Sequence, residues 1–93
     1  MAEESCRATS CAADRLIGGV GTTFHGCVVT VVTATNVIEI RDAAAAGEGT
    51  VLLSIPASTA VGTIYTMPAP IRCQTGLFVD HTGTGTVVVI SGL

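Results

Sequence analysis

The chain has 93 residues, of which 48% are hydrophobic and 12% are charged, and its net charge is −3. The small size predicts a single domain, and the balance excludes a disordered chain, whose charge would be high and hydrophobicity low. The four basic residues are all arginines and aromatic residues make up 3%, so the basic surface and stacking rings of a nucleic-acid-binding protein are missing.

Residues 1–13 contain two acids, two cysteines and small residues, without a sustained hydrophobic period. We expect an N-terminal arm here, with room for a short strand near residues 6–10, and a β domain over residues 14–93. A brief apolar strand is predicted at Arg15–Ile17. The glycine-rich run that follows it, residues 18–21, is typical of a turn.

The first long strand is predicted from Phe24 to Thr33. Because neighbouring side chains of a strand point to opposite faces, the residues divide into two sets. One set is Phe24, Gly26, Val28, Thr30 and Val32, and the other is His25, Cys27, Val29 and Val31. Both sets are mainly apolar, so we expect both faces of this strand to be covered.

The middle of the chain predicts three shorter strands. Residues 37–41 alternate, with Ile38 and Ile40 inward and Glu39 and Arg41 outward, which indicates one face in water. Residues 42–49 contain four alanines but are too few for a stable helix, so we expect a loop. Further strands are predicted at residues 50–55 and 62–67, the latter ended by a stiff Pro-Ala-Pro connector at residues 68–70.

The last stretch predicts a hairpin, in which the strands at residues 77–82 and 86–91 flank a glycine turn. In its second strand Val87, Val88, Val89 and Ile90 are all apolar. Such an unbroken run indicates that both faces are covered, one by the subunit's own core and the other by a neighbour. Seven to eight short strands separated by turns predict an all-β fold, an antiparallel β-sandwich or barrel.

No motif with catalytic or metal-binding spacing is present. Asp80 and His81 are consecutive strand residues, so they point to opposite faces and cannot act together. Cys6 and Cys11 lie five residues apart, which is not the spacing of a zinc site. The glycine turn lacks the lysine of a phosphate-binding loop. We therefore expect no catalytic residues, no metal and no cofactor, and the chain is not predicted to be an enzyme.

The amino terminus also lacks the positive charge and apolar segment of a secretory signal. No run approaches the roughly 18 apolar residues that a membrane span requires. We expect synthesis in the cytoplasm, with the four cysteines as thiols there, and no association with membranes. A disulfide between Cys6 and Cys11 stays open for a particle later exposed to an oxidising medium.

The region from Arg15 to Gly92 resembles a family of small virion structural proteins of tailed bacteriophages. The resemblance is carried by three segments: GGVGTTFHGCVVTVV, IEIRDAAAAGEGTVLLSIP and GLFVDHTGTGTVVVI. It implies a jelly-roll β-sandwich that forms a homotrimer, binds the shell of major capsid protein as a decoration or cement protein, and stabilises the head. It further implies a place on the capsid surface after assembly in the host bacterial cytoplasm, and no catalytic residues.

A decoration protein binds identical subunits through shape and apolar contact. We therefore predict two groups of contact residues. The predicted subunit interface comprises Val29, Val31, Val88, Ile90 and Phe78, and an alternate set of Val87, Val89 and Val28 stays open because the sequence does not tell which face is core. The predicted capsid-contacting arm comprises Glu3, Glu4 and Arg7.

The alternative function is a small β-sandwich binding module on a tail or head fibre, which would bind a host surface or glycans. Such modules use exposed aromatic rings for sugar stacking. Tryptophan is absent here, and Phe24, Tyr65 and Phe78 are the only aromatic residues. This scarcity favours the decoration protein.

Overall fold

The computed structural model describes residues 6–32, 37–81 and 85–92. These residues form eight β-strands and no helix, and therefore none that could cross a membrane. The strands are β1 (Cys6–Cys11), β2 (Arg15–Gly18), β3 (Thr23–Val31), β4 (Ile38–Asp42), β5 (Thr50–Ile55), β6 (Ile64–Arg72), β7 (Leu77–His81) and β8 (Thr86–Gly92).

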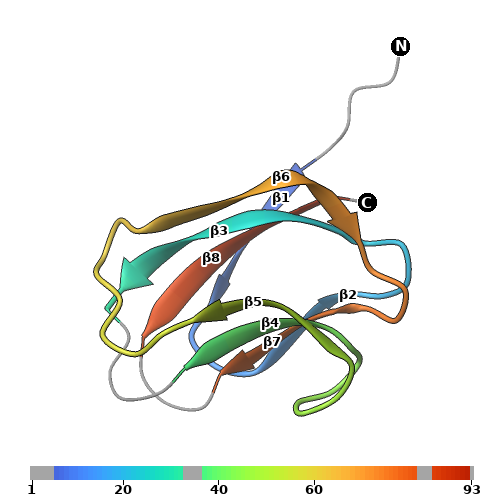
Figure 1. Cartoon of the computed structure of the whole chain (residues 1–93), viewed down its shortest axis with the longest axis horizontal. Helices are drawn as coiled ribbons and strands as arrows, with labels where there is room; N and C mark the ends of the chain where they lie inside the picture. Colours follow the sequence, from blue (N-terminus) through green and yellow to red (C-terminus); the bar gives the residue numbers. More distant parts are fainter. Residues whose placement is uncertain (1–5, 33–36, 82–84, 93) are drawn as a thin grey trace.

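The strands form two four-stranded antiparallel sheets that pack against each other (Figure 1). We call them sheet A, with the strand order β1-β8-β3-β6, and sheet B, with the order β2-β7-β4-β5. The arrangement is a β-sandwich, which confirms the predicted all-β antiparallel class. The described strand count also agrees with the predicted seven to eight.

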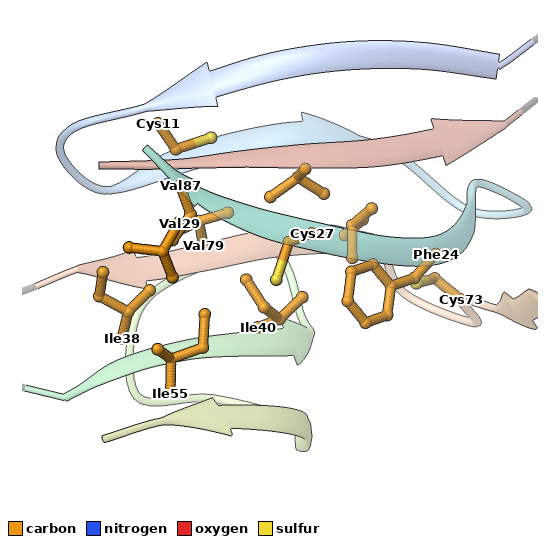
Figure 2. Packing of buried hydrophobic residues seen from close by; sticks show 12 residues of the cluster. Cys11, Phe24, Cys27, Val29, Ile38, Ile40, Ile55, Cys73, Val79 and Val87 are labelled. Carbon is orange, nitrogen blue, oxygen red and sulfur yellow. The ribbon is translucent and has the colours of Figure 1, made fainter. Parts of the chain in front are cut away.

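The core lies between the sheets and consists of aliphatic side chains, one phenylalanine and three cysteines. Sheet A contributes Phe24, Cys27, Val29, Val87 and Val89, and sheet B contributes Ile38, Ile40, Ile55, Leu77 and Val79. Figure 2 shows Phe24, Cys27 and Val29 pointing from β3 towards the isoleucines of β4 and β5. The inward positions of Ile38 and Ile40 confirm the alternation predicted for residues 37–41.

A bulge in β3 changes which of its residues face the core. Phe24 pairs with Ser91 of β8 and Gly26 pairs with Ile90, so His25 is an extra residue without a partner in β8. An extra residue exchanges the two faces of everything beyond it. Phe24, Cys27 and Val29 therefore all point inward, which corrects the strict alternation that placed Phe24 and Cys27 on opposite faces.

Strands β7 and β8 do not form the predicted hairpin. β7 lies in sheet B between β2 and β4, whereas β8 lies in sheet A between β1 and β3. Both strands carry apolar side chains that need cover from the opposite sheet, and the chain crosses between the sheets after His81. Of the connections between consecutive strands, only the one from β4 to β5 joins neighbours in the same sheet.

Two further segments differ from their predicted form. Residues 6–11, predicted as part of an arm with room for a strand, are strand β1 and pair along their whole length with β8. The sandwich therefore includes residues that precede residue 14, and only residues 1–5 of the predicted arm lie outside the described residues. The Pro-Ala-Pro segment does not end a strand, because β6 continues through it to Arg72.

Candidate interface on the outer face of sheet A

The surface of sheet A that points away from the core consists of two rows of side chains that each cross all four strands. Because the neighbouring residues on β3 and β8 are buried in the core, these rows point outward. The first row is Ser10, Val88, Val28 and Ile64, and the second is Ala8, Ile90, Gly26 and Thr66. We call these eight residues the outer face.

The outer face contains a shallow groove of about 420 Å³ between β3 and β6. Gly26 lies in this groove with a φ of +151°, and a Cβ atom at this position would stand 2.2 Å from the carbonyl oxygen of Tyr65. The absence of a side chain therefore lets β6 approach β3 closely. Ile64, whose side chain is 70% exposed, lines the same groove, with Val28 and Ile90.

The outer face carries no charge, and the described acidic residues lie elsewhere. Strands β1, β3, β6 and β8 contain no aspartate or glutamate, and their charged residues are Arg7 and Arg72. Both arginines lie at the same end of sheet A, where Arg7 pairs with Ser91 of β8 and Arg72 pairs with Thr23 of β3. The centre of sheet A therefore has no charged side chain that would keep it hydrated.

The outer face of sheet B carries charged side chains beside exposed apolar ones. The guanidinium of Arg41 on β4 donates to the carboxylates of Glu39 and Asp80, with 3.1 Å between its Nε and Oδ2 of Asp80. The same Asp80 oxygen accepts a hydrogen bond from the amide of Gly47. Charged groups that are paired in this way at a surface keep it hydrated, so sheet B shows the solvated face that the sequence predicts for β4.

Asp42 fixes the end of β4 to the loop between β6 and β7. Its carboxylate accepts hydrogen bonds from the backbone amides of Gln74, Thr75 and Gly76, at 3.0, 2.8 and 3.3 Å. The bonds from Gln74 and Thr75, followed by that from Gly76, lower the pKa of the Asp42 carboxyl because they favour its charged form. This polar contact joins segments far apart in the sequence at one end of sheet B.

The predicted interface residues divide between the surface and the core. Val88 and Ile90 lie on the outer face, and Val31 is exposed at the end of β3. Val29 is fully buried in the core. Phe78 is only 9% exposed and lies on the outward-pointing side of β7, where it pairs with Arg41, so neither residue belongs to the outer face of sheet A. The bulge at His25 explains why Val29 is buried, because it turns that side chain towards sheet B.

The alternate set divides as well. Val87 and Val89 are fully buried, whereas Val28 lies on the outer face opposite Val88. The surface group thus combines Val88 and Ile90 from one predicted set with Val28 from the other. Sequence reasoning missed Ile64 and Thr66, although an apolar residue at the start of the strand predicted at residues 62–67 was a usable signal for Ile64.

The predicted arm residues are only partly placed. Glu3 and Glu4 lie outside the described residues. Arg7 is exposed on β1 and borders a cleft of about 620 Å³ at one end of the sandwich, which is also lined by the Gly18–Val20 segment and Gly92. Arg7 therefore belongs to a sheet edge.

The polar residues considered for chemistry lie apart. Asp80 points outward to Arg41, whereas His81 is buried on the inner side, where its Nε2 lies 2.7 Å from the carbonyl oxygen of Gly85. This confirms that the two side chains occupy opposite faces. Among the described residues, no group of three or more histidines, cysteines, aspartates or glutamates is arranged to hold a metal ion.

The cysteines in the core are unreactive thiols. All four cysteines are free, and only Cys6 is exposed. Burial raises the pKa of the Cys27 thiol to about 12 and that of Cys73 to about 11. Burial also raises the pKa of Cys11. Because the thiolate is the nucleophile, these three groups are inert at neutral pH and act as small apolar side chains.

No known protein family, curated protein or solved structure matches the chain.

Proposed function

We propose that the chain is a structural virion protein, a capsid decoration protein that assembles as a homotrimer and binds the major capsid protein. The observation that carries the proposal is the outer face, an uncharged surface across all four strands of sheet A. Contact through such a surface removes apolar groups from water and requires no catalytic chemistry. The trimer and its place on the capsid come from the sequence resemblance.

The order of the strands supports the same assignment. The sheet orders β1-β8-β3-β6 and β2-β7-β4-β5 support a jelly-roll topology, which also has eight strands and repeated crossings between two sheets. This architecture occurs in viral capsid domains and also in lectins. One fold serves many functions. The choice between a capsid protein and a sugar-binding protein therefore depends on the residues at the surface.

The surface favours assembly over glycan binding. The three aromatic residues are withdrawn from the surface: Phe24 and Phe78 are buried, and Tyr65 is partly buried and packs against the core. A sugar-binding module needs an exposed ring on which the sugar can stack. Aliphatic side chains such as Val28, Ile64 and Ile90 instead provide the non-directional contact of a subunit interface.

Substitution of Ile64 tests the assembly surface. Ile64→Lys places a charge in the groove of sheet A, and because the side chain is exposed the fold should remain intact. Val51→Lys is the matched control, since Val51 is an exposed aliphatic residue that pairs with Arg41 on sheet B. We expect native mass spectrometry to give three chains, or a multiple of three, for wild type and Val51→Lys, and fewer than three for Ile64→Lys.

A monomeric wild-type protein, or an Ile64→Lys variant that still forms the three-chain unit, would contradict this use of the outer face. The place on the virion needs a separate measurement. Image reconstruction of the assembled particle should show the trimer on the head, whereas density on the tail or a fibre would favour the alternative binding module.

A further inference from the structure

The four edge strands of the sandwich differ in how regularly they pair. Three of them contain extra residues that their inner neighbours lack: β2 has Ile17, β5 has Leu52, and β6 has residues 67–70 opposite the single residue His25. Bulges and prolines of this kind prevent an edge from accepting another strand. β1 alone pairs with its neighbour without a shift, from Cys6 to Cys11.

The edge of β1 is therefore regular enough to pair with a further strand, whereas the other three edges are interrupted by bulges or prolines. Among the described residues β8 is the only strand that pairs with β1, so the backbone N–H and C=O groups on the opposite side of β1 have no described strand as partner. The strand contains no proline, and Arg7 is its only charged residue. A regular edge with these properties accepts an extended strand in an antiparallel or parallel arrangement.

We propose that β1 pairs antiparallel with β1 of a second copy, about a twofold axis at Ala8. Because residues on the same face must stand opposite each other, this register places Ala8 against Ala8, Cys6 against Ser10, and Arg7 against Thr9. All pairs on the outer face then consist of small side chains, and Arg7 of one copy does not stand opposite Arg7 of the other. A register centred on Thr9 would instead place Arg7 against the buried Cys11.

We assign the edge to a second copy because it brings an identical unpaired strand, and in that register no side chain of β1 stands directly opposite a like charge. A twofold contact is also the commonest arrangement in homo-oligomers. The pairing joins two copies of sheet A into one sheet and sets their outer faces side by side. It leaves the outer face uncovered, so it is compatible with the proposed trimer but does not depend on it.

Charge complementation at Ala8 tests the contact. The experiment uses the Ile64→Lys background, so that association through the outer face does not obscure the result. The parent should form dimers, and Ala8→Lys or Ala8→Glu should each weaken dimerisation by roughly tenfold or more, because like charges meet on the axis. An equimolar mixture of the two variants should restore a heterodimer, counted by native mass spectrometry.

A cysteine substitution tests the register independently. In Ser10→Cys the new thiol stands opposite the exposed native Cys6 of the second copy, so mild oxidation should give an interchain disulfide. Thr9→Cys is the matched control, because residue 9 points to the other face and should not cross-link to Cys6. Circular dichroism and thermal melting verify that each variant keeps the fold.

A parent that stays monomeric, or a mixture that forms no heterodimer beyond the level of each variant alone, overturns the proposal. So does the absence of a disulfide in Ser10→Cys, which is the result expected if β1 accepts a strand of a different protein. These outcomes are separate from the test of the outer face. Loss of the trimer in Ile64→Lys supports the outer face even when β1 does not pair.

Discussion

Gly26 has a backbone conformation and a neighbour that other residues do not tolerate. Its φ is +151° and a Cβ atom would approach the backbone of Tyr65 to 2.2 Å. We expect Gly26→Ala to lower the free energy of unfolding by about 2–3 kcal/mol, through strain and displacement of β6. Gly47→Ala is the control, because Gly47 also has positive φ (+76°) but has no atom within 4 Å of a Cβ; its loss should be about 1 kcal/mol.

Urea unfolding of the two variants measures this difference. Equal losses for Gly26→Ala and Gly47→Ala would show that the close approach of β6 contributes nothing beyond the backbone conformation. A larger loss at Gly26 would tie the groove of the outer face to this single glycine.

Asp42 gives the fold a dependence on pH. Because its pKa is lowered in the folded state from the ordinary value of 3.8, its contribution is present above that value and is lost as the pH falls through the folded pKa. We expect Asp42→Asn to cost about 1 kcal/mol at pH 7, since the neutral amide is a weaker acceptor for the three backbone amides. The difference from wild type should shrink below about pH 4.

Denaturant titrations of wild type and Asp42→Asn at pH 7 and pH 3 measure this effect. A difference in unfolding free energy that is the same at both pH values would mean that the charge of Asp42 does not strengthen its bonds to residues 74–76.

Which residues face the core could be predicted where a strand is regular. Ile38 and Ile40 follow a period of two without interruption, and both are buried as predicted. For Val29 the sequence leaves the face open, and the extra residue at His25 decides it by turning Val29 inward. Nothing in the apolar run around His25 indicates a bulge, since its two faces are equally apolar.

At the level of elements, β1 is a structural part of the sandwich. It covers one edge of β8, and its Cys11 is buried in the core. Deletion of residues 1–12 should therefore remove a sheet strand and lower the thermal midpoint by roughly 10 °C or more, as expected for the loss of several kcal/mol from a small domain. Deletion of residues 2–5 is the control and should leave the midpoint within a few degrees of wild type.

Thermal melting followed by circular dichroism distinguishes the two deletions. If both melt like wild type, β1 is dispensable for the sandwich. If capsid attachment is later measured, the shorter deletion is the appropriate variant, because it tests Glu3 and Glu4 without removing part of sheet A.

The existence of most strands could be predicted, but their partners could not. The strand at residues 50–55 was predicted with the bounds that the structure shows. The predicted hairpin of β7 and β8 was wrong because a glycine turn is compatible with two outcomes, a return within one sheet or a crossing to the other. Only the packing of both apolar strands against opposite sheets decides between them, and that information is not local.

At the scale of the whole molecule, the two sheets present different surfaces to their surroundings. Sheet B carries the ion pairs of Arg41 with Glu39 and Asp80, and sheet A carries an outer face without charge. The sequence indicated a second apolar face through the unbroken run at residues 87–90. It could not indicate the extent of that face, because Gly26, Ile64 and Thr66 join it only through strand pairing.

The two prolines in β6 limit how far sheet A can grow. Pro68 and Pro70 lack backbone donors and lie in the irregular part of this edge. Once β1 is occupied by a second copy, the joined sheet is bounded on both sides by β6. We therefore expect association through strand edges to stop at two subunits and not to propagate into a filament.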